Sequence, residues 1–236
     1  MVKEKSYKIH HHNKIPGEKL RTDFKDSLHA AEIEFKEEPM DENYSNILVG
    51  KLSKGRVARL VKEMGNLKGK KVLDVGCEAG FVSLQFAKEG AELTSFDICE
   101  PALHNFRRKE GSSEIGIFLA AAQKMPIDDE VFDFVVCTEV LEHMPHREMG
   151  IKEMHRVMKK GGKLLLTFPN EKLRQPLYPL AKLFGVNTSV ENEVTLFDYK
   201  FEDILKICEK HFKIEKKYSW PFFYPVTRFA VCKKVK

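Results

Sequence analysis

A strand, turn and helix pattern at residues 71–88, followed by an acid at Asp97, constrains the fold most strongly. The apolar residues Val72, Leu73 and Val75 predict a buried strand. Gly76 and Gly80 bracket a turn before an apolar, helix-compatible segment. In open α/β sheets such a turn lies at the carboxyl edge, where a nucleotide-like ligand binds. Asp97 ends the next predicted strand, at about the spacing that places an acid on ribose hydroxyls. The segment therefore predicts an adenosine site.

Two side chains in this turn distinguish between adenosine ligands. A dinucleotide-binding turn needs glycine at the positions that Gly76, Glu78 and Phe81 occupy here. The Glu78 carboxylate would repel a pyrophosphate, and Phe81 would push the helix away from the strand. S-adenosylmethionine has no phosphate and carries sulfonium and ammonium groups, so an acidic turn suits it. The turn thus favours S-adenosylmethionine and disfavours a nicotinamide-dependent oxidoreductase.

The chain continues as alternating predicted strands and helices. We expect strands at 91–96, 115–120, 132–137 and 163–168, and helices at 45–65, 100–110 and 147–159. Gly161 and Gly162 are predicted to stop the last of these helices. Strands separated by helices of about ten residues imply βαβ units with right-handed crossovers. The pattern predicts an α/β fold with a parallel, doubly wound sheet.

The C-terminal part has a different rhythm. Residues 169–197 contain three prolines and no clear period, which is typical of a lid-like insertion. A helix is expected at Phe201–Cys208, with Asp198 as its N-cap. Two β-like runs, 212–218 and 226–231, then suit an antiparallel pair that closes the sheet.

Composition limits the domain organisation and the partners. Residues 1–45 are polar and charge-dense and are expected to form an N-terminal arm, whereas 46–236 form one domain. The net charge of +5 is modest and the lysines are spread along the chain, so nucleic acid is not favoured as a partner.

Cysteine usage and hydropathy indicate the compartment. The five cysteines show no CxxC pair and no metal-like spacing with histidine, so we expect buried thiols and no metal site. No apolar run approaches the roughly 20 residues that a transmembrane helix needs. We therefore expect a cytoplasmic protein without a transmembrane segment.

Residues 70–168 resemble the class I S-adenosylmethionine-dependent methyltransferases, in particular the group with the ubiquinone and menaquinone methylases. Asp74, Gly76 and Gly80 match the family's first motif, an acid followed by G-x-G-x-G. The stretch 121–145, which contains Glu-Val-Leu-Glu-His, resembles the region around the family's fourth strand. The resemblance implies a Rossmann-like fold with a seven-stranded mixed sheet, six strands parallel and one antiparallel, and S-adenosylmethionine as cofactor.

A cofactor site along the carboxyl edge follows from the turn and the resemblance together. The residues expected to bind the cofactor are Asp74, Gly76, Cys77, Glu78, Gly80, Asp97, Ile98, Ala121, Ala122, Gln123 and Thr138. Ala121 stands where the resemblance implies an acid on the adenine amino group, so the backbone N–H groups of Ala122 and Gln123 are left to hold the adenine edge. We hypothesise that Glu78, which replaces the middle glycine, attracts the methionine ammonium and partly compensates.

His143 is the candidate catalytic residue. Methyl transfer from a sulfonium is an in-line displacement, so a base is needed only for a weakly acidic acceptor hydroxyl. Glu139, Glu142 and His143 follow the fourth predicted strand, and His143 has the pKa range suited to a base at neutral pH. A local packing or capping role for His143 is the alternative, and both stay open.

The aromatic segment between Pro221 and Pro225 has two interpretations. Trp220, Phe222, Phe223 and Tyr224 suit a platform for a lipid, a quinone ring or a nucleobase. They equally suit a hairpin that packs at the sheet edge or forms a homodimer contact.

These patterns predict an enzyme that transfers a methyl group to oxygen or carbon of a small molecule. A quinone, a lipid or a lipid-linked sugar are the acceptor classes that the resemblance suggests. The alternative is a non-catalytic S-adenosylmethionine-binding or interaction protein with a degenerate site, motivated by Glu78 and Ala121.

Overall fold

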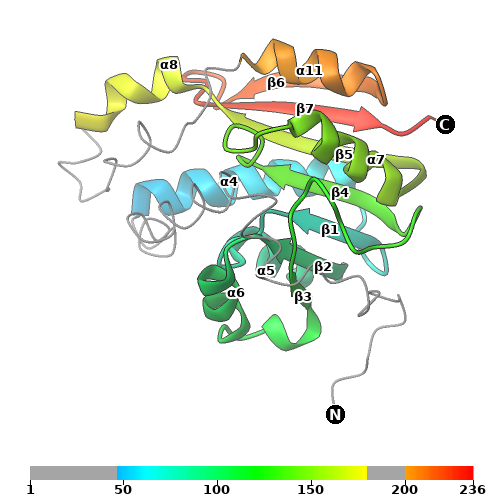
Figure 1. Cartoon of the computed structure of the whole chain (residues 1–236). Helices are drawn as coiled ribbons and strands as arrows, with labels where there is room; N and C mark the ends of the chain where they lie inside the picture. The colour runs from blue at the N-terminus through cyan, green and yellow to red at the C-terminus, as the bar shows by residue number, and fades with distance from the viewer. Residues whose placement is uncertain (1–46, 180–199, 236) are drawn as a thin grey trace.

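A seven-stranded sheet forms the centre of the protein, in a computed structural model that describes residues 47–179 and 200–235 (Figure 1). The strands are β1 (Lys71–Val75), β2 (Glu92–Asp97), β3 (Gly116–Leu119), β4 (Phe132–Thr138), β5 (Met158–Pro169), β6 (Lys213–Trp220) and β7 (Thr227–Lys233). Their order is β3-β2-β1-β4-β5-β7-β6. The first five strands pair in parallel, and β7 pairs antiparallel with both β5 and β6. The predicted sheet, with six strands in one direction and one reversed, is confirmed.

Helices cover both faces of this sheet. They are α4 (Ile47–Met64), α5 (Phe81–Lys88), α6 (Glu100–Arg107), α7 (Arg147–Val157), α8 (Glu171–Arg174) and α11 (Phe201–Glu209), with short 3₁₀ turns at Ser112–Glu114 and Gln175–Leu177. Buried side chains of α4, α5 and α6 belong to one apolar cluster, and those of α7 and α11 belong to another. The sheet is therefore the middle layer of three, as expected for a doubly wound fold.

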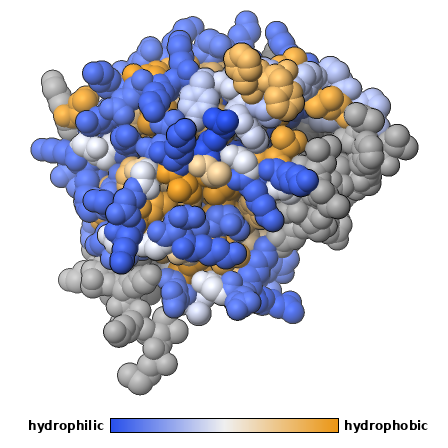
Figure 2. All heavy atoms as spheres, turned by 180° about the vertical axis from the view of Figure 1, so that it is seen from behind, coloured by the Kyte–Doolittle hydropathy of each residue, from blue (hydrophilic) through white to orange (hydrophobic). Residues whose placement is uncertain are grey.

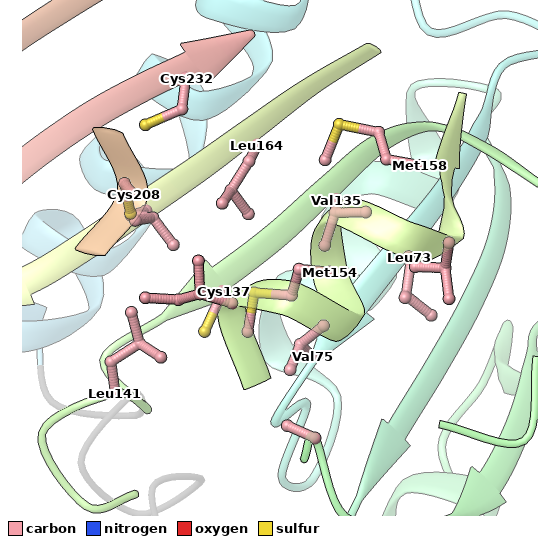
Figure 3. Packing of buried hydrophobic residues seen from close by; sticks show 14 of the residues in the cluster. Leu73, Val75, Val135, Cys137, Leu141, Met154, Met158, Leu164, Cys208 and Cys232 are labelled. Atoms are coloured by element: carbon pink, nitrogen blue, oxygen red, sulfur yellow. The ribbon is translucent and has the colours of Figure 1, made fainter. Parts of the chain in front are cut away.

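The central strands contribute to both clusters because successive side chains point to opposite faces. In β4, Val135 and Cys137 pack toward α7 and α11, whereas Phe134 and Val136 pack toward α4 and α5. Figure 3 shows Cys137 beside Met154 of α7, with Cys208 of α11 nearby. All five cysteines are free and buried, so each contributes a small apolar side chain to the packing.

Two local expectations were wrong. The helix predicted at 147–159 ends at Val157, and Gly161 and Gly162 lie inside β5 rather than stopping a helix. They belong to a bulge, because Phe132 of β4 pairs with Met158 whereas Phe134 pairs with Lys163. A Cβ on Gly162 would lie 2.6 Å from Cγ of Met158, so only glycine fits this bend without a shift.

The segment after β4 is irregular. Residues 139–146 form turns and bends, and Glu139 and His146 have positive φ angles of 55° and 51°. The predicted N-terminal arm, the N-cap at Asp198 and most of the lid-like insertion lie outside the described residues. Among the residues that the structure does describe, no helix is long and apolar enough to cross a membrane.

Met154 tests the packing of α7 on the sheet. Its side chain is fully buried in the cluster between α7, β4 and α11. We expect Met154→Ala to lower the free energy of unfolding by about 2–5 kcal/mol, because it removes apolar contacts and leaves a cavity. Urea denaturation followed by circular dichroism measures this change. Lys152→Ala, at an exposed position of the same helix, is the control and should change stability by less than about 0.5 kcal/mol.

Candidate active site

A cavity opens at the carboxyl edge of the sheet, beside the ends of β1, β2 and β4. The sheet order reverses at this point, because β1 lies between β2 and β4, and such a switch point is where α/β folds bind ligands. The residues that line the cavity are Arg56, Asp74, Gly76, Cys77, Glu78, Phe81, Val82, Phe96, Asp97, Ile98, Cys99, Ala120, Ala122, Gln123, Thr138, Glu139, Val140, His143 and Met144. All the predicted site residues except Gly80 and Ala121 are among them.

The Asp97 carboxylate is held in a fixed orientation at the end of β2. Its Oδ2 accepts the backbone N–H of Glu78 at 2.8 Å, and its Oδ1 accepts the N–H of Cys99 at the same distance. A carboxylate has about four acceptor positions, so it can accept more than two hydrogen bonds. A carboxylate held in this orientation in the cavity lining suits hydrogen bonding to a pair of ligand hydroxyl groups.

Asp74 is a buried carboxyl on the neighbouring strand. Its Oδ2 accepts the Ser83 hydroxyl at 2.6 Å, whereas its Oδ1 has no partner among the described residues. Burial raises the pKa of Asp74 to about 7, although the Ser83 hydrogen bond acts in the opposite direction. A cation at this edge of the cavity would stabilise the ionised form of Asp74.

The two glycines of the turn have different roles. Gly76 lines the cavity, and a Cβ on it would lie 2.4 Å from the side chain of Val140, two residues past the end of β4. A Cβ on Gly80 would lie 2.2 Å from the Phe106 ring, and the φ angle of Gly80 is +83°. Gly80 therefore lets α6 pack against the turn and does not itself line the cavity.

Glu78 has an unusual backbone conformation for a residue with a side chain. Its φ angle is 46°, in the left-handed region that favours glycine. This conformation accompanies the hydrogen bond that its N–H donates to Asp97. Glu78 lines the cavity, so its carboxylate adds negative charge beside the turn and would oppose a phosphate there. Its predicted attraction for an ammonium group stays a prediction.

Ala121 is buried beside the cavity but is not among its lining residues. Only 1% of its surface is exposed, and it packs with Leu119 and with Ile98, which does line the cavity. Its neighbours Ala122 and Gln123 do line the cavity. Any adenine contact from this segment therefore falls to Ala122 and Gln123.

A largely buried ion-pair cluster lies at one side of the cavity, to which it contributes Arg56 and Glu139. The Glu139 carboxylate, just past β4, accepts Arg56 Nη1 at 2.6 Å and also pairs with Arg174 of α8. Burial acts to raise the pKa of Glu139, but Arg174 and Arg56 outweigh it and lower the pKa to about 2. Glu139 is therefore ionised at neutral pH and unsuited to act as a base.

His143 and Glu142 are neighbours with different environments. His143 lines the cavity, while Glu142 is 3% exposed and is not part of the lining. Neither carboxyl oxygen of Glu142 has a hydrogen-bond partner among the described residues. Burial raises the pKa of Glu142 to about 8, with a smaller opposing effect from His143. Glu142 is therefore neutral near pH 7, and only His143 of this pair is in place to accept a proton from a ligand.

Arg56 is a charged cavity residue that sequence reasoning missed. A basic residue is seldom expected on the buried face of an amphipathic helix. Ser53, Arg56, Val57 and Leu60 are all buried, so Arg56 lies within this face. The available signal for a buried Arg56 was its position next to Val57, where the apolar residues of the helix begin. Its partner Glu139 is distant in sequence, so the pair could not be predicted.

The residues present fit S-adenosylmethionine. The oriented Asp97 carboxylate would suit ribose hydroxyls, and the buried Oδ1 of Asp74 would suit a cationic ligand. The side chains of Phe81 and Val140 make part of the cavity wall apolar. The acidic turn is unsuited to a pyrophosphate. The geometry thus agrees with the cofactor class that the sequence favoured.

Comparison with known proteins also points to methyltransferases. Residues 73–166 match the sequence family described as a methyltransferase domain. The ubiquinone biosynthesis O-methyltransferase of Pseudomonas aeruginosa (strain LESB58) is 34% identical over 129 residues, which are 53% of this chain and 53% of that protein. The enzyme of the same description from Coxiella burnetii (strain Dugway 5J108-111) is 32% identical over 124 residues, 52% of this chain and 53% of that protein. The chain spans about half the length of the curated relatives it matches.

The sequence comparison thus places a methyltransferase domain at residues 73–166. Solved structures share its fold. A Pyrococcus horikoshii OT3 protein superposes with a TM-score of 0.65 at 19% identity, covering 78% of this chain and 91% of that chain. The magnesium protoporphyrin IX methyltransferase of Synechocystis PCC 6803, solved with bound SAH, gives a TM-score of 0.58 at 23% identity over 78% of this chain and 82% of that chain.

Glu142 predicts a pH dependence of the stability of this methyltransferase domain. The folded state keeps a proton on Glu142 up to about pH 8, whereas an unperturbed glutamate releases it near 4.5. Between these values the native state loses stability as pH rises, by up to about 1.4 kcal/mol per pH unit. We expect Glu142→Gln to raise the Tm relative to wild type at about pH 8, and much less at about pH 5.

Thermal unfolding at these two pH values measures the effect. Glu110→Gln, at an exposed position, is the matched control and should shift the Tm equally at both. A Glu142→Gln shift that is the same at both pH values would contradict the assignment of a neutral buried carboxyl.

Proposed function

We propose that this protein is an S-adenosylmethionine-dependent methyltransferase that acts on oxygen or carbon of a small molecule. The observation that carries the proposal is the Asp97 carboxylate, fixed by two backbone N–H groups beside the unpartnered oxygen of Asp74. The methyltransferase-domain match and the relatives described as O-methyltransferases support it. S-adenosylmethionine, when bound, supplies a methyl group on a positively charged sulfur.

The residues of the chain position this cofactor. Asp97 binds the ribose hydroxyls, and Asp74 faces the cationic methionine part, directly or through water. Ala122 and Gln123 lie along the adenine end, and the turn at Gly76 admits the methionine part. Because the leaving group of methyl transfer is neutral, holding the acceptor in line and excluding water provide most of the catalysis.

The acceptor side of the cavity is apolar with one candidate base. Phe81, Val140 and Met144 provide hydrophobic walls, and His143 lies among them. This lining favours an acceptor with an aromatic or other apolar body and a hydroxyl group near His143. A quinol or a lipid-linked compound has this chemistry, and the relatives described as acting in ubiquinone biosynthesis support the quinol class. His143 then accepts the hydroxyl proton as the acceptor oxygen attacks.

Calorimetric titration with S-adenosylmethionine and S-adenosylhomocysteine tests the cofactor assignment. We expect both ligands to bind and a nicotinamide dinucleotide not to bind. Asp97→Asn should weaken binding of both by roughly tenfold to a hundredfold, because it removes hydrogen bonds to a charged acceptor. Asp203→Asn, on the exposed side of α11, is the control. Unchanged affinity of the Asp97→Asn variant would contradict the site.

His143→Ala tests the base. We expect kcat with a phenolic acceptor to fall by about 10²–10⁴, with little change in calorimetric S-adenosylmethionine affinity, because the base acts on the acceptor and not on the cofactor. His155→Ala, which removes a histidine that packs on Phe212, is the control. Full turnover in the His143→Ala variant would leave His143 with a packing role only. Cofactor binding without turnover of any acceptor in the wild type would instead indicate a non-catalytic binding protein.

A further inference from the structure

The connection between β6 and β7 places two phenylalanines almost entirely in solvent. Phe222 is 97% exposed and Phe223 is 87% exposed, between Pro221 and Pro225. Large apolar side chains exposed to this degree side by side are uncommon on a monomer and indicate an interaction site. The cavity does not include either ring, so the predicted aromatic platform is not part of the cofactor pocket.

The backbone that carries these phenylalanines is anchored on both sides. The Tyr224 hydroxyl donates to the carbonyl of Leu173 at 2.8 Å, and Asn170 Nδ2 donates to the carbonyl of Pro225 at 3.0 Å. On the other side, the Trp220 ring packs so closely on Gly55 of α4 that a Cβ there would lie 2.6 Å from it. The aromatic segment therefore divides: Trp220 and Tyr224 fasten the loop, and Phe222 and Phe223 project from it.

This loop lies at the same end of the sheet as the cavity. Strand β6 runs parallel to β1 and β4, so its carboxyl end at Trp220 is at the carboxyl edge (Figure 1). Arg174 connects the two regions, because it pairs with Glu139 at the cavity and donates from Nε to the carbonyl of Val226 at 3.2 Å. A surface contacted by Phe222 and Phe223 would thus face the cavity end of the protein.

The helix beside this loop is basic. Lys51, Lys54 and Arg59 of α4 are exposed, and Arg59 lies over the Trp220 ring at 5.3 Å. The single acid of α4, Glu63, pairs with Lys216 of β6 at 2.7 Å. Seen from behind in Figure 2, the surface is mostly hydrophilic, with hydrophobic residues in limited areas. The loop that carries the two phenylalanines thus adjoins a helix with exposed basic residues, through the contacts of Trp220 with Gly55 and Arg59.

We propose that Phe222 and Phe223, with the basic residues of α4, dock the protein on an anionic lipid bilayer. Apolar side chains that enter the interface, combined with basic residues on the headgroups, are the two contributions that peripheral membrane binding requires. A second copy of the chain is a less suitable partner for this surface. The two phenylalanine rings provide on the order of 400 Å² of apolar area, whereas a stable dimer buries about 800 Å² on each partner. Docking in this orientation turns the mouth of the cavity toward the lipid phase.

Vesicle co-sedimentation of the full chain tests this inference. We expect wild type to bind phosphatidylcholine vesicles that contain phosphatidylglycerol, and to bind pure phosphatidylcholine more weakly. The double variant Phe222→Ser with Phe223→Ser should lose roughly tenfold or more of this affinity, because two apolar side chains no longer enter the bilayer. Lys51→Gln with Lys54→Gln should weaken binding only to the anionic vesicles. Val235→Ser, which changes another exposed apolar residue (57%) at the opposite edge, should bind as wild type does.

Two further readouts separate the alternatives. Trp220 is the only tryptophan of the chain and directly precedes the loop, so brominated lipid tails should quench its fluorescence in wild type and not in the double serine variant. Analytical ultracentrifugation tests whether a second copy of the chain covers the two phenylalanines instead. A wild-type dimer that the serine variant converts to monomer would overturn the proposal. Absence of vesicle binding, or equal binding by the serine variant, would also overturn it. Calorimetric cofactor binding by the same variants does not depend on vesicle binding. Failure of the membrane proposal can therefore be distinguished from failure of the proposed methyltransferase function.

Discussion

The largely buried ion pairs of Glu139 hold three elements together at the cavity. A carboxylate between Arg56 and Arg174 joins the end of β4 to helix α4 on one side and to α8 on the other. Burying such charges is costly, and the cost is offset only when each charge is paired and hydrogen-bonded. Two guanidinium groups on one carboxylate meet this condition, which is why the pKa of Glu139 falls to about 2 despite its burial. The same Arg174 also holds the β6–β7 loop through Val226.

This arrangement separates charged from neutral carboxyl groups within a short stretch of chain. Glu139 is ionised because two arginines face it, whereas burial without a hydrogen-bond partner keeps Glu142 neutral. On the neighbouring strand, burial gives Asp74 a pKa of about 7, so a cationic ligand would determine its charge. The negative charge that remains at the cavity then comes from Asp97 and Glu78, which suits a cofactor with a positive sulfur and no phosphate. Electrostatics and shape thus select the same class of ligand.

The features that suit an apolar acceptor lie together at one end of the protein. At the carboxyl edge lie the cavity, the anchored loop with Phe222 and Phe223, and the basic start of α4. With the protein docked on a bilayer as proposed, an apolar acceptor in the lipid would lie at the end of the protein that carries the cavity. Anchoring matters here because a loop free to fold back would bury its phenylalanines against the protein, and the hydrogen bonds from Tyr224 and Asn170 oppose this.

The sequence by itself determined the class of fold, the turn at Gly76 and Gly80, and the position of Asp97, because these depend on local pattern and short spacing. It did not determine the ends of α7 or the bulge at Gly161 and Gly162, where pairing with β4 and β7 overrides a glycine pair that would otherwise stop a helix. Only the tertiary structure decided that Arg56 belongs to the cavity and that Ala121 does not. It also decided that Trp220 is an anchor whereas Phe222 is exposed. Each of these depends on contacts between residues far apart in the chain, and burial at such contacts is set by which elements pack together rather than by the residues themselves.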